Sequence, residues 1–547
     1  MCDGSIWCSY TQKFFFKILV KEHYYQPISF RVTPKCYSVL KRQPMRAYDQ
    51  LESLFTTIYR LQHVLGLCHW DMNTYMAPKA QEARGEAISL LNKIEFQSIT
   101  APEVKKWIDE ATTGQDELSP VQRSNLRKMT MLWSRMNLLS EGFLHRKAKL
   151  TTMAHGVWKR SRAANRFADF LPILRALVSI AREEGAALAA GSSRTPYEAL
   201  MDVYEPGLTI PRMDALIANL KSWLPRLLRD VVKKQAAETP PILPFEGPFP
   251  EARQAALGRD LMRVWKFDFE AGRLDSSPHP FTGMTKEDCR LTTAYAAEDP
   301  LKSLFAVVHE VGHGKYEQNI GPRRHLTQPI CTAPSLGAHE SQSLFAEFQL
   351  ARDPALLEVL RGKLEAHLGP QAGFSPANFR RAVHRVRPGF LRVGADEVSY
   401  PLHVILRYEI ERDLVDGGLP PEAVPAAWEA KMKEYFGLET AGRDDRGCLQ
   451  DIHWSLGSIG YFPTYLIGAM FAAQLMATIR EELGEEKLRN ALQTGDLECI
   501  LAKQKEKIWD HGSLYTTDEL IERATGEGLN PAYLHQHLVS RYLGDAG

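Results

Sequence analysis

The stretch that most constrains the fold is "AVVHEVGHGKYEQ", residues 306–318, in which two histidines and a glutamate interrupt an apolar pattern. His309 and His313 are four residues apart, so on an α-helix their side chains lie on one face, one turn apart. The two imidazoles can then bind a single metal ion through one ring nitrogen each. Glu310 lies about 100° further around such a helix. That position suits a general base that takes a proton from a water molecule on the metal.

The five residues from His309 to His313 match the HExxH motif of zinc peptidases. Asp299 and Pro300 predict where the helix begins, because Asp caps a helix N-terminus and Pro is tolerated at the first helical position. An apolar face is expected from Leu301, Leu304, Phe305, Val308 and Val311. Two uncompensated histidines on a buried helix would be costly. We therefore interpret the helix as a metal site and not as an ordinary helix with two polar residues.

A catalytic zinc ion needs a third protein ligand and one open coordination position. The metzincin pattern is excluded, because its Gly and His positions are occupied by Tyr316 and Asn319. A gluzincin takes a Glu from a following helix, and Glu340 lies 27 residues after His313 in "GAHESQSLFAEFQL". From spacing alone three competing ligands remain, namely His325, His339 and Glu347. Glu317 is expected to be a charge on the helix surface.

Helical patterns dominate the rest of the chain. Apolar residues recur at steps of three and four in residues 47–67, 211–234 and 401–415. The best strand candidates are "VWKFDF" (264–269) and "CRLTTAY" (289–295), and residues 272–288 between them read as a loop. We predict a mainly α-helical body with a small β-sheet near residues 264–295, next to the metal-binding helix.

One segment, residues 454–479, contains no charged residue and is long enough to cross a bilayer. Polar side chains and Pro463 interrupt it. A central helix of a large helical protein is also apolar all round, because it is buried all round. We predict a buried helix and not a membrane anchor.

Composition limits the partners and the compartment. The net charge of the 547 residues is +1, which gives no reason to expect nucleic acid. The eight cysteines form no CxxC pair, which fits a reducing compartment, and we predict the cytoplasm. Residues 1–44 differ, with seven basic and two acidic residues. They read as an organellar targeting segment, a disordered extension, or sequence upstream of a true start at Met45.

Six motifs in order resemble those of the carboxypeptidase Taq family of metallopeptidases. They are HPF (279–281), DCRLT (288–292), HEVGH (309–313), HESQ (339–342), LRVGAD (391–396) and GCLQDIHW (447–454). The one departure is Leu391, where the family prefers Ile or Asn. The resemblance divides the chain into an N-terminal extension (1–44) and a metallocarboxypeptidase catalytic unit (45–547). A lobe boundary is expected near the Pro-rich residues 237–250.

The resemblance implies a mostly helical, two-lobed fold with a deep active-site groove, usually as a homodimer. It implies an enzyme that acts on peptides with a free C-terminus, removes single residues with broad specificity and disfavours C-terminal proline. It makes Glu340 the third metal ligand with His309 and His313. Zinc, one ion per chain, is favoured because two His and one Glu with an open position suit it, and Co²⁺ or Mn²⁺ are substitutes. No membrane partner is expected.

The remaining roles depend on residues inside these motifs. His453, Tyr465 and then Tyr461 are candidate donors to the developing oxyanion, because on one helix all three would lie on roughly one face, although Pro463 would disturb it. Arg392 and Arg290 are candidates for binding the substrate carboxylate. For each arginine the alternative is a structural ion pair, with Asp396 or with Asp288 respectively.

Two other functions stay open at this point. A gluzincin endopeptidase or dipeptidase would share the metal helix but lack a carboxylate anchor. A catalytically inactive helical scaffold would use the groove only to bind peptides. The complete ligand set and Glu310 argue against the scaffold.

Overall fold

The computed structural model describes residues 46–544, which fold into helices and one small sheet. The first helices are α1 (Ala47–Asn73), α2 (Gln81–Ile99), α3 (Pro102–Thr113), α4 (Pro120–Leu138), α5 (Glu141–Ala163), α6 (Phe167–Ala189), α7 (Pro196–Tyr204), α8 (Ile210–Ala236) and α9 (Glu251–Val264). The central ones are α10 (Pro300–Glu317), α11 (Leu336–Leu344), α12 (Pro354–Leu368), α13 (Pro376–Val383) and α14 (Tyr400–Asp416). The last are α15 (Val424–Phe436), α16 (Pro463–Leu483), α17 (Glu485–Thr494), α18 (Glu498–Lys507), α19 (Thr517–Thr525) and α20 (Ala532–Leu543). The predicted extension, residues 1–44, lies outside the described residues.

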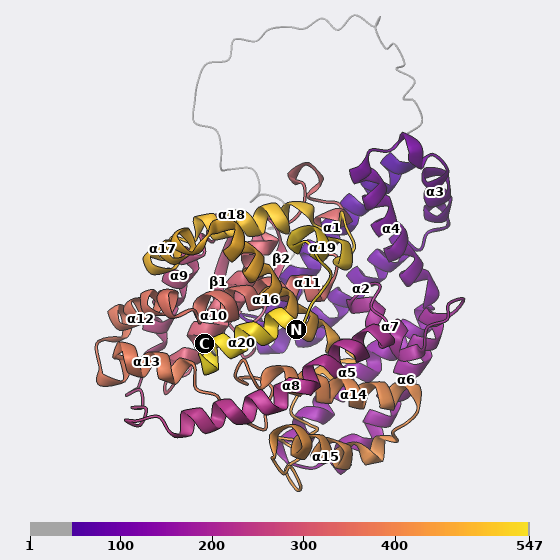
Figure 1. Ribbon diagram of the computed structural model, residues 1–547. Coiled ribbons are helices and arrows are strands. Elements are labelled where there is room, and N and C mark those ends of the chain that lie inside the picture. Colours follow the sequence, from indigo (N-terminus) through magenta and orange to yellow (C-terminus); the bar gives the residue numbers. More distant parts are fainter. Residues whose placement is uncertain (1–45, 545–547) are drawn as a thin grey trace, which may run out of the picture. The chain divides into compact units, whose positions relative to one another are not determined.

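The predicted mainly helical class is confirmed, and the sheet lies against α10 as expected (Figure 1). Its strands are β1 (Gly272–Ser276), β2 (Thr282–Thr285) and β3 (Asp288–Thr293). The order is β1-β3-β2, with β1 parallel and β2 antiparallel to β3. The strand predicted at 289–295 is therefore confirmed as β3.

The second predicted strand is wrong. Residues 264–269 form the end of α9 and a turn, in which Lys266 has a φ of +53° that a strand does not allow. Two strands lie instead inside 272–288, which read as a loop. They are short and polar, and their backbone hydrogen bonds to β3, in which Cys289 and Leu291 are buried, hold them in place.

Buried apolar side chains form two clusters. The smaller one joins α1, α3 and α4 through residues such as Leu51, Phe55 and Met129. The larger one contains buried residues from α5 to α20, including the metal helix. Helices α8 and α9, on either side of 237–250, both belong to the larger cluster. The lobe boundary at this stretch, the two lobes and the deep groove stay predictions.

The charge-free segment is a buried helix over most of its length, as predicted. Helix α16 begins at Pro463, and its residues from Leu466 to Met476 are all buried. It lies among α11, α14 and α20 (Figure 1). Within residues 46–544 the structure has no helix that is both long and apolar enough to cross a membrane.

Candidate metal centre and active site

Helix α10 begins where the sequence predicts. The Asp299 side chain accepts a hydrogen bond from the backbone N–H of Leu301 at 3.1 Å, and Pro300 is the first helical residue. Leu304, Val308 and Val311 are fully buried on the face toward the core. This packing fixes the rotation of the helix, so His309 and His313 point together toward α11.

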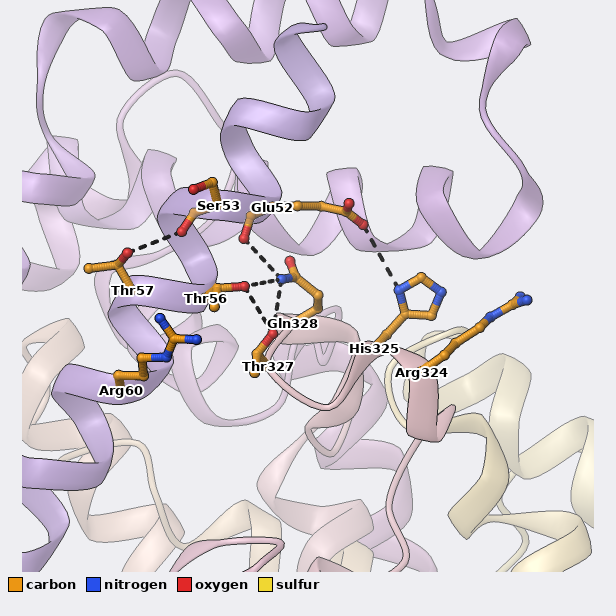
Figure 2. A pocket seen from close by; sticks show the side chains of 9 residues that line it. All are labelled: Glu52, Ser53, Thr56, Thr57, Arg60, Arg324, His325, Thr327 and Gln328. Carbon is orange, nitrogen blue, oxygen red and sulfur yellow. Dashed lines mark hydrogen bonds and ion pairs between the residues drawn. The ribbon is translucent and has the colours of Figure 1, made fainter. Parts of the chain in front are cut away.

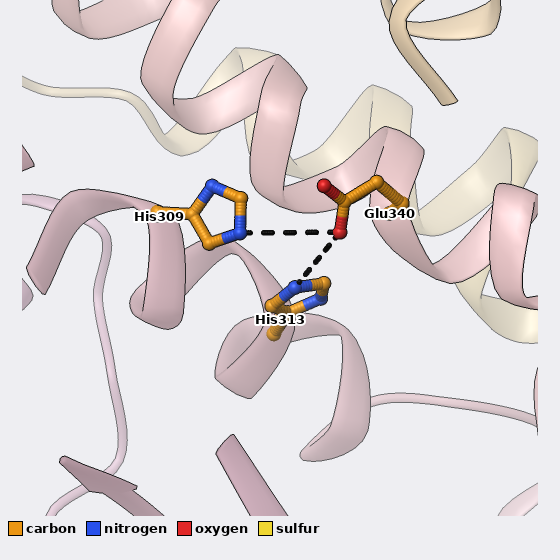
Figure 3. Close-up of side chains that lie close together, drawn as sticks. All are labelled: His309, His313 and Glu340. Carbon is orange, nitrogen blue, oxygen red and sulfur yellow. Dashed lines mark ion pairs between the residues drawn. The ribbon is translucent and has the colours of Figure 1, made fainter. Parts of the chain in front are cut away.

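Three potential ligand side chains converge between α10 and α11 (Figure 3). The Nε2 atoms of His309 and His313 lie 3.9 and 3.3 Å from Oε2 of Glu340. One ligand atom from each residue lies within 4.8 Å of the others. Two imidazole nitrogens and one carboxylate oxygen at this separation fit a divalent metal ion of the borderline-soft kind. The three predicted ligands are thus brought together.

Two glycines allow α11 to approach this closely. A Cβ on Gly312, inside the HExxH motif, would lie 2.6 Å from the carbonyl oxygen of Gln342. On the other side of α11, a Cβ on Gly468 of α16 would lie 2.9 Å from Cγ of Glu340. Because both positions are glycine, the backbones of α10 and α16 approach α11 closely and hold Glu340 between them.

We expect Gly312→Ala to lower the free energy of unfolding by about 1–3 kcal/mol, because the added methyl group has no room and must push α11 away. Metal content should fall with it, since Glu340 moves with α11. Gly362→Ala on α12 is the matched control, because nothing lies within 4 Å of its Cβ position. Denaturant unfolding and metal analysis of both variants test this. Equal stability and metal content in the two variants would contradict the packing argument.

A second carboxylate orients His309 from behind. Oε2 of Glu347 lies 3.0 Å from Nδ1 of His309, which leaves Nε2 for the metal. Arg352 donates to the other Glu347 oxygen at 3.0 Å. Glu347 lies in a π-helical segment, η5 (Phe345–Ala351), that continues α11. Glu347, which spacing left as a competing ligand, is therefore a hydrogen-bond partner of His309.

The other two competitors pair with carboxylates outside the predicted ligand set. His339 stacks on His313 with ring centroids 4.5 Å apart, and its Nε2 is 2.8 Å from Oε1 of Glu317. The expectation that Glu317 is a surface charge is wrong, because His339 packs against this side of α10 and pairs with it. His325 lies in a short 3₁₀ segment (Arg323–His325), 3.9 Å from Glu52 of α1.

Glu310 is buried beside the three predicted ligands. Its Oε2 accepts a 2.6 Å hydrogen bond from the hydroxyl of Thr282 on β2. Burial raises the pKa of the Glu310 carboxyl, and the charge of His309 and the Thr282 hydrogen bond only partly oppose this. A raised pKa favours proton uptake near neutral pH. Sequence reasoning missed Thr282, because β2 was read as a loop.

The predicted oxyanion donors also come together, but not on one helix as expected. His453 lies in a 3₁₀ turn, η8 (His453–Leu456), and α16 begins only at Pro463. Nε2 of His453 is 3.3 Å from the Tyr465 hydroxyl, and the rings of Tyr461 and Tyr465 are 5.2 Å apart. A loop therefore brings His453 back to the start of α16.

These three side chains are neutral at physiological pH. Burial lowers the pKa of His453 to about 3 and raises that of Tyr465 to about 12. Burial also raises the pKa of Tyr461, and the charge of Glu340 contributes to the raised pKa of both tyrosines. The two tyrosines thus lie within electrostatic reach of Glu340, one of the predicted ligands, and keep their phenolic protons.

The two arginines differ in position. Arg392 donates from Nε and Nη2 to Asp451 at 3.0 and 2.9 Å, not to Asp396, and its guanidinium lies 4.9 Å from the ring centre of Tyr465. Burial raises the pKa of Asp451, but Arg392 outweighs this and holds it well below its usual range.

Arg290 donates to Asp288 from both Nε and Nη2, which is the structural ion pair that the sequence analysis gave as its alternative. Its guanidinium lies 4.3 Å from the ring centre of Trp70 on α1. The neighbouring Cys289 and Leu291 face α10, so Arg290 points to the opposite face of the sheet.

A polar pocket of about 500 Å³ lies away from the metal ligands, between α1 and the loop after α10 (Figure 2). Gln328 crosses it and donates to the Glu52 carbonyl and the Thr56 hydroxyl. His325 is the one candidate ligand that lines this pocket, and His309, His313 and Glu340 do not line it.

Comparison with known proteins decides the family. A family model described as carboxypeptidase Taq (M32) metallopeptidase matches residues 50–542. The chain belongs to this family. It is therefore a metallocarboxypeptidase, a peptide hydrolase that uses a metal ion, as the six motifs predict.

Relatives of this carboxypeptidase Taq family member match along nearly their whole length. Carboxypeptidase 1 of Bacillus subtilis is 32% identical, covering 91% of this chain and 99% of that protein. Thermostable carboxypeptidase 1 of Thermus thermophilus is 31% identical, covering 91% of this chain and 99% of that protein. The solved structure of Trypanosoma cruzi metallocarboxypeptidase 1 is 52% identical and has a TM-score of 0.89, covering 91% of this chain and 99% of that chain.

Proposed function

We propose that the chain is a zinc carboxypeptidase that removes single C-terminal residues from peptides, with broad side-chain specificity and with C-terminal proline disfavoured. The observation that carries the proposal is the convergence of three sets of groups. The ligands His309, His313 and Glu340, the carboxyl of Glu310, and the neutral donors around Tyr465 all gather between α10, α11 and α16.

The residues divide the chemistry between them. When bound at His309, His313 and Glu340, a zinc ion supplies Lewis-acid polarisation of a carbonyl and acidifies water. Glu310 takes the proton from the attacking water and delivers it to the leaving amine. The Tyr465 hydroxyl and His453, with Tyr461 as the alternative, donate to the oxyanion that develops. Co²⁺ or Mn²⁺ would serve in place of zinc.

An exopeptidase must also bind the terminal carboxylate, and Arg392 is the better candidate. It lies against the Tyr465 ring, and its Nη1 has no hydrogen-bond partner among the described residues, which leaves it available to a substrate. Arg290 remains the alternative, but its position on the α1 face of the sheet argues against it. Asp451 would hold the Arg392 fork in orientation.

We expect a decapeptide with a free C-terminus to lose one residue at a time and its C-terminal amide to stay intact. Arg392→Ala should lower kcat/KM for the free peptide by about 10–100-fold, the value of a charged hydrogen bond. Arg290→Ala is the matched control and should change it little. Mass spectrometry of timed digests measures both. Internal cuts in both peptides would favour an endopeptidase, and bound metal without cleavage would favour a binding scaffold.

We further propose a cytoplasmic homodimer. The five cysteines among the described residues are free thiols, three of them buried, which supports a reducing compartment. The homodimer rests on the family resemblance, and the molar mass in solution tests it.

A further inference from the structure

A buried ion pair lies behind the proposed oxyanion donors. Arg407 and Glu411, one turn apart on α14, have fully buried side chains, and Nε of Arg407 donates to Oε1 of Glu411 at 2.8 Å. Neither Nη1 nor Nη2 of Arg407 has a hydrogen-bond partner within the described residues. Such a pair is a poor source of stability, because desolvation of both charges offsets their attraction. A contribution to stability therefore does not explain why the pair lies at this position.

Glu411 binds both ends of the loop that precedes α16. Its Oε1 accepts from the indole N–H of Trp454 at 2.9 Å, and its Oε2 accepts from the backbone N–H of Gly460 at 3.0 Å. Trp454 directly follows His453, and Gly460 directly precedes Tyr461. The carboxylate thus holds a side chain next to His453 and the backbone next to Tyr461.

Arg407 contacts two aromatic rings of the same loop. Its guanidinium carbon lies 3.8 Å from the ring centre of Trp454 and 4.6 Å from that of Phe462. Phe462 directly follows Tyr461, so each ring belongs to the neighbour of a proposed donor. Cation–π contacts of this kind gain strength when the cation is desolvated, as it is here.

We propose that Arg407 and Glu411 are positioning residues, which hold residues 453–462 so that His453 and Tyr461 stay against Tyr465 at the start of α16. This proposal rests on the proposed function, in which those side chains stabilise the transition state. The loop needs such support, because residues 457–462 form neither helix nor strand. Four contacts with one buried pair replace the regular backbone hydrogen bonds that a helix would supply.

Glu411→Gln tests the proposal, with Glu409→Gln as the matched control. One amide oxygen can replace only one carboxylate oxygen, and the amide N–H₂ would face another donor, so one end of the loop is released. We expect kcat to fall by about 10–100-fold with KM and metal content roughly unchanged. Glu409 lies on the same helix and pairs with Lys221, Lys431 and Tyr435, away from the loop. Its variant should keep the wild-type kcat.

A normal kcat in folded Glu411→Gln, whatever its thermal stability, would overturn the positioning role. If Glu411→Gln does not fold, Trp454→Phe decides, since it removes only the indole N–H and keeps a ring over Arg407. A several-fold loss of kcat in Trp454→Phe supports the proposal, and no loss overturns it. His453→Ala distinguishes the proposed donor role from the proposed positioning role. A normal kcat in His453→Ala refutes the donor role itself. A loss of kcat in His453→Ala, with normal kcat in Glu411→Gln and Trp454→Phe, refutes only the positioning role.

Discussion

Glu310→Gln is expected to lower kcat by about 10³-fold while the protein keeps its metal ion. The amide has nearly the same shape as the carboxylate, and its oxygen can still accept the hydrogen bond from Thr282. It cannot take up a proton, so the attacking water is no longer deprotonated and the leaving amine is no longer protonated. Steady-state kinetics on a peptide with a free C-terminus and metal analysis of the same sample measure the two quantities.

Thr282→Val is the control for this variant. It removes only the hydroxyl that contacts Glu310, and we expect kcat to fall by about 10–100-fold, the value of one hydrogen bond to a charged group. If Glu310→Gln retained wild-type kcat at full metal occupancy, another group would have to be the base. A loss of metal from the variant would mean that Glu310 acts on the ligands and not on the water.

Removal of the third ligand should have the second large effect. We expect Glu340→Gln to weaken metal binding by more than about 100-fold, because it replaces an anionic oxygen ligand, whereas loss of an outer-shell partner costs about 10–100-fold. Glu347→Gln provides that comparison, because Glu347 contacts His309 at Nδ1 and not at Nε2, the nitrogen that faces Glu340. Excess metal should restore activity to Glu347→Gln more readily than to Glu340→Gln.

Thermal unfolding gives a readout of the same site that does not depend on activity. A ligand that binds only the folded protein stabilises it by about 4 kcal/mol at 1,000 times its Kd. A chelator should therefore lower the Tm of the wild-type protein and leave that of Glu340→Gln nearly unchanged. Wild-type metal affinity in Glu340→Gln would assign the third ligand to another residue, with His339 and Glu347 as the neighbours to test.

Several features of the site follow from local rules. The spacing of His309 and His313 places both on one helix face, because an α-helix repeats every 3.6 residues. The start of α10 follows from Asp299 and Pro300, which act on their own backbone neighbours. The burial of α16 follows from its apolar residues on every face. The first two interactions lie within one helix, and the third needs only a helix that is apolar all round, so the pattern of residues is sufficient to predict them.

Packing between segments decided the rest. Spacing alone left Glu340, His325, His339 and Glu347 as competing ligands, and the packing of α11 against Gly312 and Gly468 brings Glu340 next to His309 and His313. The strands β1 and β2 exist because β3 supplies their hydrogen bonds, which no pattern within them reveals.

The oxyanion donors show the same division most clearly. The sequence by itself determined that His453, Tyr461 and Tyr465 are close along the chain and that a metal helix lies elsewhere in it. That the three side chains meet, with both tyrosines within electrostatic reach of Glu340, was decided only by the tertiary structure. The loop between His453 and α16 has no regular repeat, so its path depends on distant contacts such as those of Glu411 with Trp454 and Gly460. A helical periodicity predicts positions within one helix, whereas the course of a loop depends on the surfaces against which it packs.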